Sequence, residues 1–155
     1  MRRRPIIVKT VARWVAGFVF LYGLYIVVFG HLSPGGGFAG GVILACAFVL
    51  QLLAMGKKRA RRSLPLAATK VLDSAGALAF LALALLGLVA GIGFFDNFLG
   101  TGERFHVFSA GIIPLCNIAV AVKVCASLAL VSVVLAVLRV TANGTDEDLR
   151  SEEEE

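Results

Sequence analysis

Four long apolar runs dominate this chain of 155 residues and leave little room for a water-soluble fold. They cover residues 8–29, 38–55, 66–95 and 109–140. A helix needs about 20 apolar residues to cross the hydrocarbon core of a membrane, because lipid offers the backbone no hydrogen-bond partner. The sequence therefore predicts an all-α integral membrane protein with four transmembrane helices. The last two runs exceed one bilayer crossing, so these helices should tilt or protrude.

The composition excludes several other classes of protein. Hydrophobic residues make up 59% of the chain and charged residues 16%, whereas soluble domains are about 25% charged. Three cysteines are too few for a secreted disulfide scaffold. The net charge of +5 is concentrated in blocks beside the apolar runs, which is typical of topology signals and not of a nucleic-acid-binding surface.

These basic blocks predict how the chain is oriented. Arginines at 2–4 precede the first run, five Lys and Arg residues fill 57–62, and Arg139 and Arg150 come at or after the end of the fourth run. The two loops on the opposite side hold only Arg104. The positive-inside rule therefore places both termini in the cytoplasm. Residues 1–140 form the predicted membrane domain, and the acidic segment 141–155 is predicted to be a disordered or docking tail.

The connection between the first two runs is rich in glycine and contains Pro34, which predicts a tight hairpin. Two lines of glycines continue into the second run, each with the four-residue spacing that allows close helix packing; they are Gly36 with Gly40, and Gly37 with Gly41. One interpretation is a closely packed hairpin and nothing more. The other is that His31, which would titrate near physiological pH, lies on an ion or proton route.

Lys123 lies near the middle of the fourth run. A cation there costs about 2.5–3.5 kcal/mol on the insertion scale, so its side chain should face protein or water. Two roles remain open for Lys123. It could belong to a structural ion pair at a subunit interface, or it could take part in proton or ion movement.

Asp73 is the only carboxylate inside a predicted span, so it is a natural partner for Lys123. The predicted helix lengths nevertheless place the two residues at different depths, which disfavours direct contact. Asp73 could instead stabilise the start of its own helix or pair with Lys70. Asn117 is a further polar residue that could hydrogen-bond across helices, and Pro114 predicts a kink or a broken first turn.

No other pattern indicates chemistry. The three cysteines share no metal-ligand spacing, and His31 and His106 do not by themselves make a metal site. Ser109, Ser127 and Ser132 are expected to be ordinary hydroxyls in helix packing. We therefore expect no metal, no cofactor and no enzymatic activity on this chain alone.

Two segments resemble a known family. FGHLSPGGGFAGGVILA, at 29–45, and IPLCNIAVAVKV, at 113–124, are similar to the MnhB family, the B subunits of Mrp (Mnh) type multisubunit cation/proton antiporters. The resemblance covers residues 8–140. Within it, His31, Pro34 and Phe38 match the hairpin motif, while Asn117 and Lys123 match the motif of the fourth span.

The resemblance implies a small subunit of a large complex in the cytoplasmic membrane of a prokaryote, surrounded by other membrane subunits and lipid. That complex would exchange Na⁺ for H⁺. The same module also occurs in membrane-bound hydrogenases and related respiratory complexes, so a redox-driven complex is an open alternative. A third is a purely structural assembly subunit. The residues do not distinguish the three, nor do they show the coupling ion or stoichiometry.

Overall fold

The computed structural model describes residues 6–32, 34–55, 65–100, 102 and 109–153, with side chains up to residue 135. Its helices are α1 (Ile6–Val28), α2 (Gly36–Met55), α4 (Leu66–Val89) and α5 (Ile113–Glu153). All four contain a window long and apolar enough to cross a membrane, which in α5 lies within Ile113–Leu135. The predicted all-α fold with four spans is thus confirmed. The basic residues at 2–4 and 57–62, and Arg104, lie outside the described residues.

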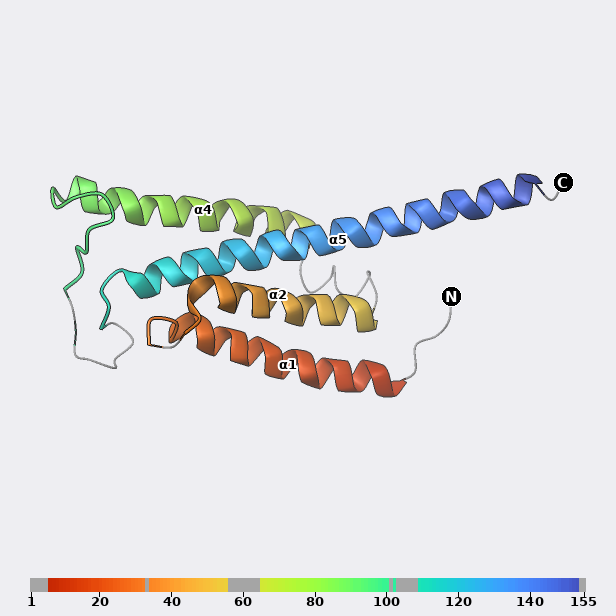
Figure 1. Cartoon of the computed structure of the whole chain (residues 1–155), viewed down its shortest axis with the longest axis horizontal. Coiled ribbons are helices and arrows are strands. Elements are labelled where there is room, and N and C mark those ends of the chain that lie inside the picture. Colours follow the sequence, from red (N-terminus) through yellow and green to blue (C-terminus); the bar gives the residue numbers. More distant parts are fainter. Residues whose placement is uncertain (1–5, 33, 56–64, 101, 103–108, 154–155) are drawn as a thin grey trace.

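The helices lie side by side in the order α1, α2, α5, α4 (Figure 1). α2 packs between α1 and α5, and α4 packs chiefly on α5. The start of α1 and the end of α5 lie at the same end of this layer (Figure 1). The side of the membrane that this end faces is not determined, so cytoplasmic termini stay a prediction.

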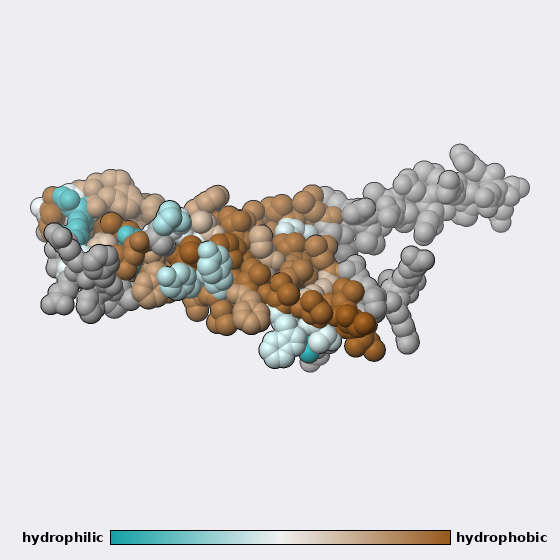
Figure 2. All heavy atoms as spheres, turned by 60° about the horizontal axis from the view of Figure 1, so that its bottom comes forward, coloured by the Kyte–Doolittle hydropathy of each residue, from teal (hydrophilic) through white to brown (hydrophobic). Residues whose placement is uncertain are grey.

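Small residues form most of the buried core. Ala16, Ala45, Ala84, Ala121 and Ala129 are each at most 2% exposed. Larger apolar side chains point outwards, among them Trp14 and Phe18 at about 70% exposure. Figure 2 shows apolar side chains along the middle of the visible face. This inside-out distribution is expected where lipid or other membrane subunits, and not water, surround the helices.

The third span ends earlier than the predicted residue 95. α4 stops at Val89, and the chain turns at Gly91, whose φ is +74°. The N–H groups of Gly91 and Ile92 donate to the carbonyls of Leu88 and Gly87, which is the Schellman arrangement for ending a helix. Phe95 then folds back so that its ring lies 5.2 Å from that of Phe80. The apolar character of 90–95 reflects this packed turn and not a longer helix.

The fourth span also differs from its prediction at both ends. Residues 109–112 form turns, because Gly111 has a φ of +60°, and helix α5 begins at Ile113. Pro114 therefore stands at the second position of the helix, where a missing N–H costs nothing. The non-helical turns at 109–112 agree with the broken first turn, one of the two predicted outcomes. At the other end α5 continues as helix through 141–153, the segment predicted to be a disordered or docking tail. This segment contains no proline to stop the helix, and a docking role for it stays a prediction.

Candidate functional site

The backbones of α4 and α5 approach closely at Gly76, one turn beyond Asp73 along α4. A Cβ added to Gly76 would lie 2.8 Å from the backbone nitrogen of Lys123 and 3.0 Å from the Ala119 carbonyl oxygen. Only glycine fits at such a distance, so this contact fixes the register of the two helices. It brings the backbone of Lys123 level with Gly76.

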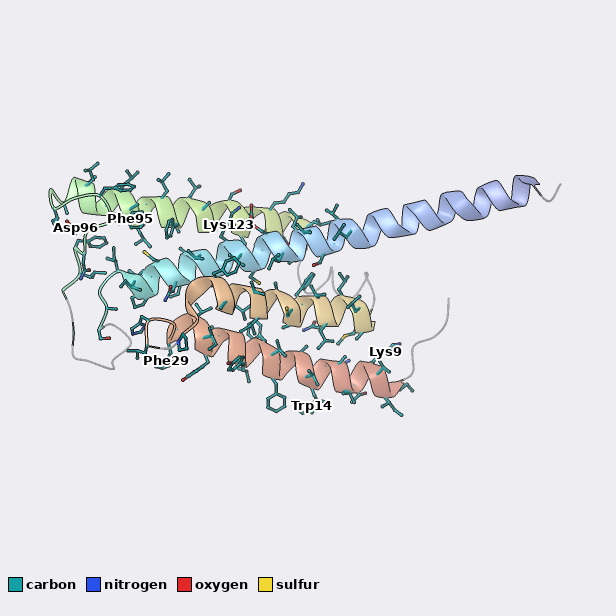
Figure 3. All side chains as sticks on the ribbon, viewed as in Figure 1. Lys9, Trp14, Phe29, Phe95, Asp96 and Lys123 are labelled. Carbon is teal, nitrogen blue, oxygen red and sulfur yellow. The ribbon has the colours of Figure 1, made fainter. Side chains whose placement is uncertain are left out.

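An ion pair joins the two helices beside this contact. The Lys123 Nζ lies 2.6 Å from the Oδ2 of Asp73. Ser127 lies one turn from Lys123 on α5, and its hydroxyl donates a hydrogen bond to the other carboxylate oxygen, Oδ1. Both oxygens of Asp73 are therefore engaged by α5, one by a charge and one by a hydroxyl. Figure 3 labels Lys123 where the two helices meet.

Direct contact between Asp73 and Lys123 was disfavoured by the sequence, and this expectation is wrong. It rested on a third span ending at 95 and a fourth beginning at 109, and both boundaries moved. With Gly76 level with Lys123, Asp73 lies only three residues away, about 4.5 Å along the helix axis. The four-carbon stem of lysine spans that offset easily.

The pair is only partly covered by this chain. The Lys123 side chain is 40% exposed and that of Asp73 is 25% exposed. Charged groups exposed to hydrocarbon are strongly disfavoured, so protein or water must cover the rest of this pair in the membrane. The geometry supports either a structural link between subunits or a point on an ion route.

The glycine hairpin is held by a different polar residue of α5. The N–H of Gly37 donates to the Asn117 Oδ1 at 3.2 Å, so Asn117 does bond across helices, as predicted. A Cβ on Gly37 would lie 2.2 Å from the Asn117 carbonyl oxygen, and one on Gly41 would lie 2.8 Å from that of Ala121. The line of Gly37 and Gly41 thus packs on α5.

Gly40, in the second line of glycines, packs against α1. A Cβ on Gly40 would lie 2.5 Å from a Val27 methyl group on α1. Gly36 has a φ of +79° and begins α2 next to Gly30, so it closes the hairpin. The glycines thus make the close helix contacts that their spacing predicted, Gly37 and Gly41 against α5 and Gly40 against α1.

The remaining hairpin residues lie at the end of the layer, away from the ion pair. His31 is half-buried in the α1–α2 turn, while Pro34 and Phe38 are exposed. Asn117 meets the hairpin at Gly37, and Lys123 lies six residues deeper along α5, about 9 Å. A role of His31 in ion movement stays a prediction.

Two polar residues have roles that the sequence did not indicate. Ser127 was expected to be an ordinary packing hydroxyl, yet it donates a hydrogen bond to Asp73. The sequence feature that could have indicated this role is its position one turn from Lys123. Asn97 lies in the loop that follows α4. Its Oδ1 accepts hydrogen bonds from the N–H groups of Leu99 and Ile112, tying the loop after α4 to the start of α5.

The model of one protein family, described as a domain related to the MnhB subunit of Na⁺/H⁺ antiporters, matches residues 7–130. This match covers most of the chain and includes the hairpin, Asp73, Asn117 and Lys123. The chain belongs to the MnhB family. The resemblance of its two motifs is thereby confirmed.

Relatives of this MnhB-family chain occur in archaea and bacteria. It is 35% identical to an uncharacterised protein of Methanocaldococcus jannaschii over 79% of this chain and 48% of that protein. It is 36% identical to a candidate antiporter subunit, mnhB2, of Staphylococcus aureus over 43% of this chain and 47% of that protein. The chain thus spans about half the length of the curated relatives it matches.

A solved structure also contains a similar fold. A chain of the membrane-bound sulfane sulfur reductase, an archaeal respiratory membrane complex, superposes with a TM-score of 0.70 and 31% identity. The match covers 84% of this chain and 56% of that chain. The MnhB-family fold is therefore found within a respiratory membrane complex.

The described residues contain no group of three or more His, Cys, Asp or Glu side chains that could hold a metal. His106 and Glu103 lie outside the described residues. Cys46, Cys116 and Cys125 are free thiols in the structure. The expectation that the chain needs no metal or cofactor stays a prediction.

Proposed function

We propose that this chain is a non-catalytic membrane subunit of a multisubunit Na⁺/H⁺ antiporter of the Mrp (Mnh) type, and that Lys123 and Asp73 lie on its ion route. The proposal places the complex in the cytoplasmic membrane of a prokaryote, with both termini of this chain in the cytoplasm. Its transported ions would be Na⁺ and H⁺, and its partners would be other membrane subunits.

The ion pair between α4 and α5 carries this proposal. Lys123 Nζ and Asp73 Oδ2 lie 2.6 Å apart within two spans that are otherwise almost wholly apolar. Burying such a pair gains little stability over well-packed apolar residues, because desolvation offsets the attraction. Ionisable groups at this depth commonly mark ion or proton pathways.

The exposed faces of the helices support a subunit and not a complete transporter. At most a third of each span's most apolar window is buried within the chain. Along α4 and the apolar part of α5, Ile113–Leu135, the charged residues are Lys70, Asp73 and Lys123, too few to line a route across the whole membrane. Other subunits would supply the rest of the route and cover the pair.

A second candidate is a membrane-arm subunit of a redox-driven ion-pumping complex. The match to a chain of the sulfane sulfur reductase complex favours it, because that match covers 84% of this chain. The match to the candidate antiporter subunit covers only 43%. In such a complex other subunits would carry the electron-transfer groups.

Mass spectrometry of the complex purified through this chain in mild detergent distinguishes the candidates. Large antiporter-like subunits without redox proteins would support the Na⁺/H⁺ antiporter. Iron–sulfur or nickel–iron proteins in stoichiometric amounts would support the redox-driven complex. Recovery of this chain alone would contradict both.

A further inference from the structure

Asp73 and Ser127 provide three oxygen atoms at one point between α4 and α5. Two belong to the carboxylate and one to the hydroxyl, which can accept bonds as well as donate them. Hard monovalent cations prefer oxygen ligands of these kinds. In the structure the ammonium group of Lys123 occupies the cation position beside this carboxylate.

We infer that Asp73 and Ser127 form a binding site for Na⁺, and that Na⁺ and the ammonium group of Lys123 occupy it alternately. This inference rests on the proposed function and names the ion-binding residues within it. When Na⁺ binds, Lys123 releases one proton to water and its neutral amine leaves the carboxylate. When Na⁺ leaves, the amine takes up a proton and returns.

Charge balance is the physical reason for this coupling. A carboxylate within apolar spans requires one compensating cation, and two cations at one carboxylate would leave an uncompensated positive charge. The site therefore holds either Na⁺ or protonated lysine. One proton leaves for each Na⁺ that binds, so the exchange is electroneutral at the site.

The packing of the two helices suits an exchange that moves only the lysine side chain. The contact at Gly76 holds the α4 and α5 backbones together, so Asp73 and Ser127 keep their places. The Lys123 side chain is 40% exposed on this chain, so its flexible stem is only partly enclosed by this chain's own packing.

The surrounding charged and titratable groups are few. On α4 the exposed Lys70 lies one turn before Asp73. On α5 the half-buried Cys116 and Cys125 lie seven and two residues from Lys123. On α2, which packs against α5, Cys46 is the one titratable group. Within α2, α4 and Ile113–Leu135 of α5, Asp73 is the one carboxylate, so no other residue of these segments can replace it as counter-ion.

Lys123→Arg is the variant that tests this inference. Arginine keeps the positive charge and can pair with Asp73, but it does not lose its proton in proteins. A purely structural ion pair should tolerate the change, whereas an alternating site should be blocked. Lys70→Arg, the same substitution at an exposed lysine one turn from Asp73, is the matched control.

The readout is proton release by the purified complex when NaCl replaces choline chloride at equal ionic strength. A Na⁺-induced infrared difference spectrum of the carboxylate bands is recorded on the same samples. We expect the wild-type complex and Lys70→Arg to release one proton more per complex than Lys123→Arg. The Na⁺-induced carboxylate signal should disappear in Lys123→Arg and in Asp73→Asn.

The Ser127 hydroxyl is tested separately. Ser127→Ala should weaken the response to Na⁺ several-fold, while Ser132→Ala, which removes a hydroxyl bonded only to its own helix at Leu128, should not. A wild-type response to Na⁺ in Lys123→Arg or Asp73→Asn would overturn the inference. So would the absence of any Na⁺ response in the wild-type complex, even if transport assays upheld the proposed function.

Discussion

The ammonium group of Lys123 lies 2.6 Å from the Asp73 carboxylate, which joins two spans by opposite charges within their apolar segments. If either residue were removed, the other would leave an uncompensated charge within the membrane spans. The pair is therefore best tested by removing its members separately and together.

Single substitutions of the pair should impair assembly more than the double substitution does. Asp73→Asn and Lys123→Met each leave one uncompensated charge between α4 and α5, whereas the double variant leaves none. We expect less complex in the membrane for each single variant and partial recovery for the double variant, measured by quantitative immunoblotting. Equal yields for all three would contradict pairing in the assembled complex.

Adding a methyl group at Gly41 should separate α2 from α5. The new Cβ would lie 2.8 Å from the Ala121 carbonyl oxygen, which is backbone and cannot move aside cheaply. We expect Gly41→Ala to lower the thermal unfolding midpoint of the purified complex by several degrees. Gly17→Ala is the matched control, because a Cβ on Gly17 meets no atom within 4 Å. A Gly41→Ala midpoint as high as that of this control would refute the close approach.

Removal of the Asn117 amide should weaken the hairpin by a smaller amount. Asn117→Ala loses the bond from the Gly37 N–H at 3.2 Å, and hydrogen bonds between membrane helices average about 0.6 kcal/mol. We expect a small fall in the unfolding midpoint, below that of Gly41→Ala. Asn117→Asp keeps an acceptor oxygen but adds a charge, so it is not a clean control. Ser132→Ala is used instead, because the Ser132 hydroxyl bonds only its own helix, at the Leu128 carbonyl. A loss of stability as large for Ser132→Ala would contradict the role of Asn117.

The loop after α4 should depend on Asn97. Its Oδ1 accepts from Leu99 and Ile112, so Asn97→Ala leaves both N–H groups without this partner. We expect faster amide hydrogen exchange at 97–100 and 109–113, with unchanged exchange in α1. Exchange rates like those of the wild type at Ile112 would show that the loop is held by other contacts.

Much of the fold could be predicted from the sequence, because the membrane restricts the choices. Apolar length predicted four spans, and the four-residue spacing of Gly37 and Gly41 predicted a close helix contact. The end of α4 was missed because Gly91 ends the helix through backbone conformation, while the apolar residues after it keep the hydropathy high. Apolar length alone does not separate a helix from a packed turn.

For the candidate site, the sequence predicted which charged residues take part but not that they touch. Asp73 and Lys123 stand out as charges in apolar runs, but their contact depends on the register of α4 and α5. That register is fixed at Gly76, and neither neighbour four residues away on α4, Leu72 or Phe80, is a small residue that would mark a close helix contact. Ser127 gained its role only once the same register placed it beside Asp73.

Ion exchange by complexes carrying Lys123→Met tests the central claim most directly. Everted membrane vesicles are energised to form a pH gradient, NaCl is added, and the collapse of the gradient is followed with a fluorescent amine. Subunit composition is checked by mass spectrometry, and Lys70→Met is the control. The account predicts normal exchange for Lys70→Met and none for Lys123→Met in a complex with its full set of subunits. Normal Na⁺/H⁺ exchange by fully assembled Lys123→Met would contradict it and leave the pair a structural link.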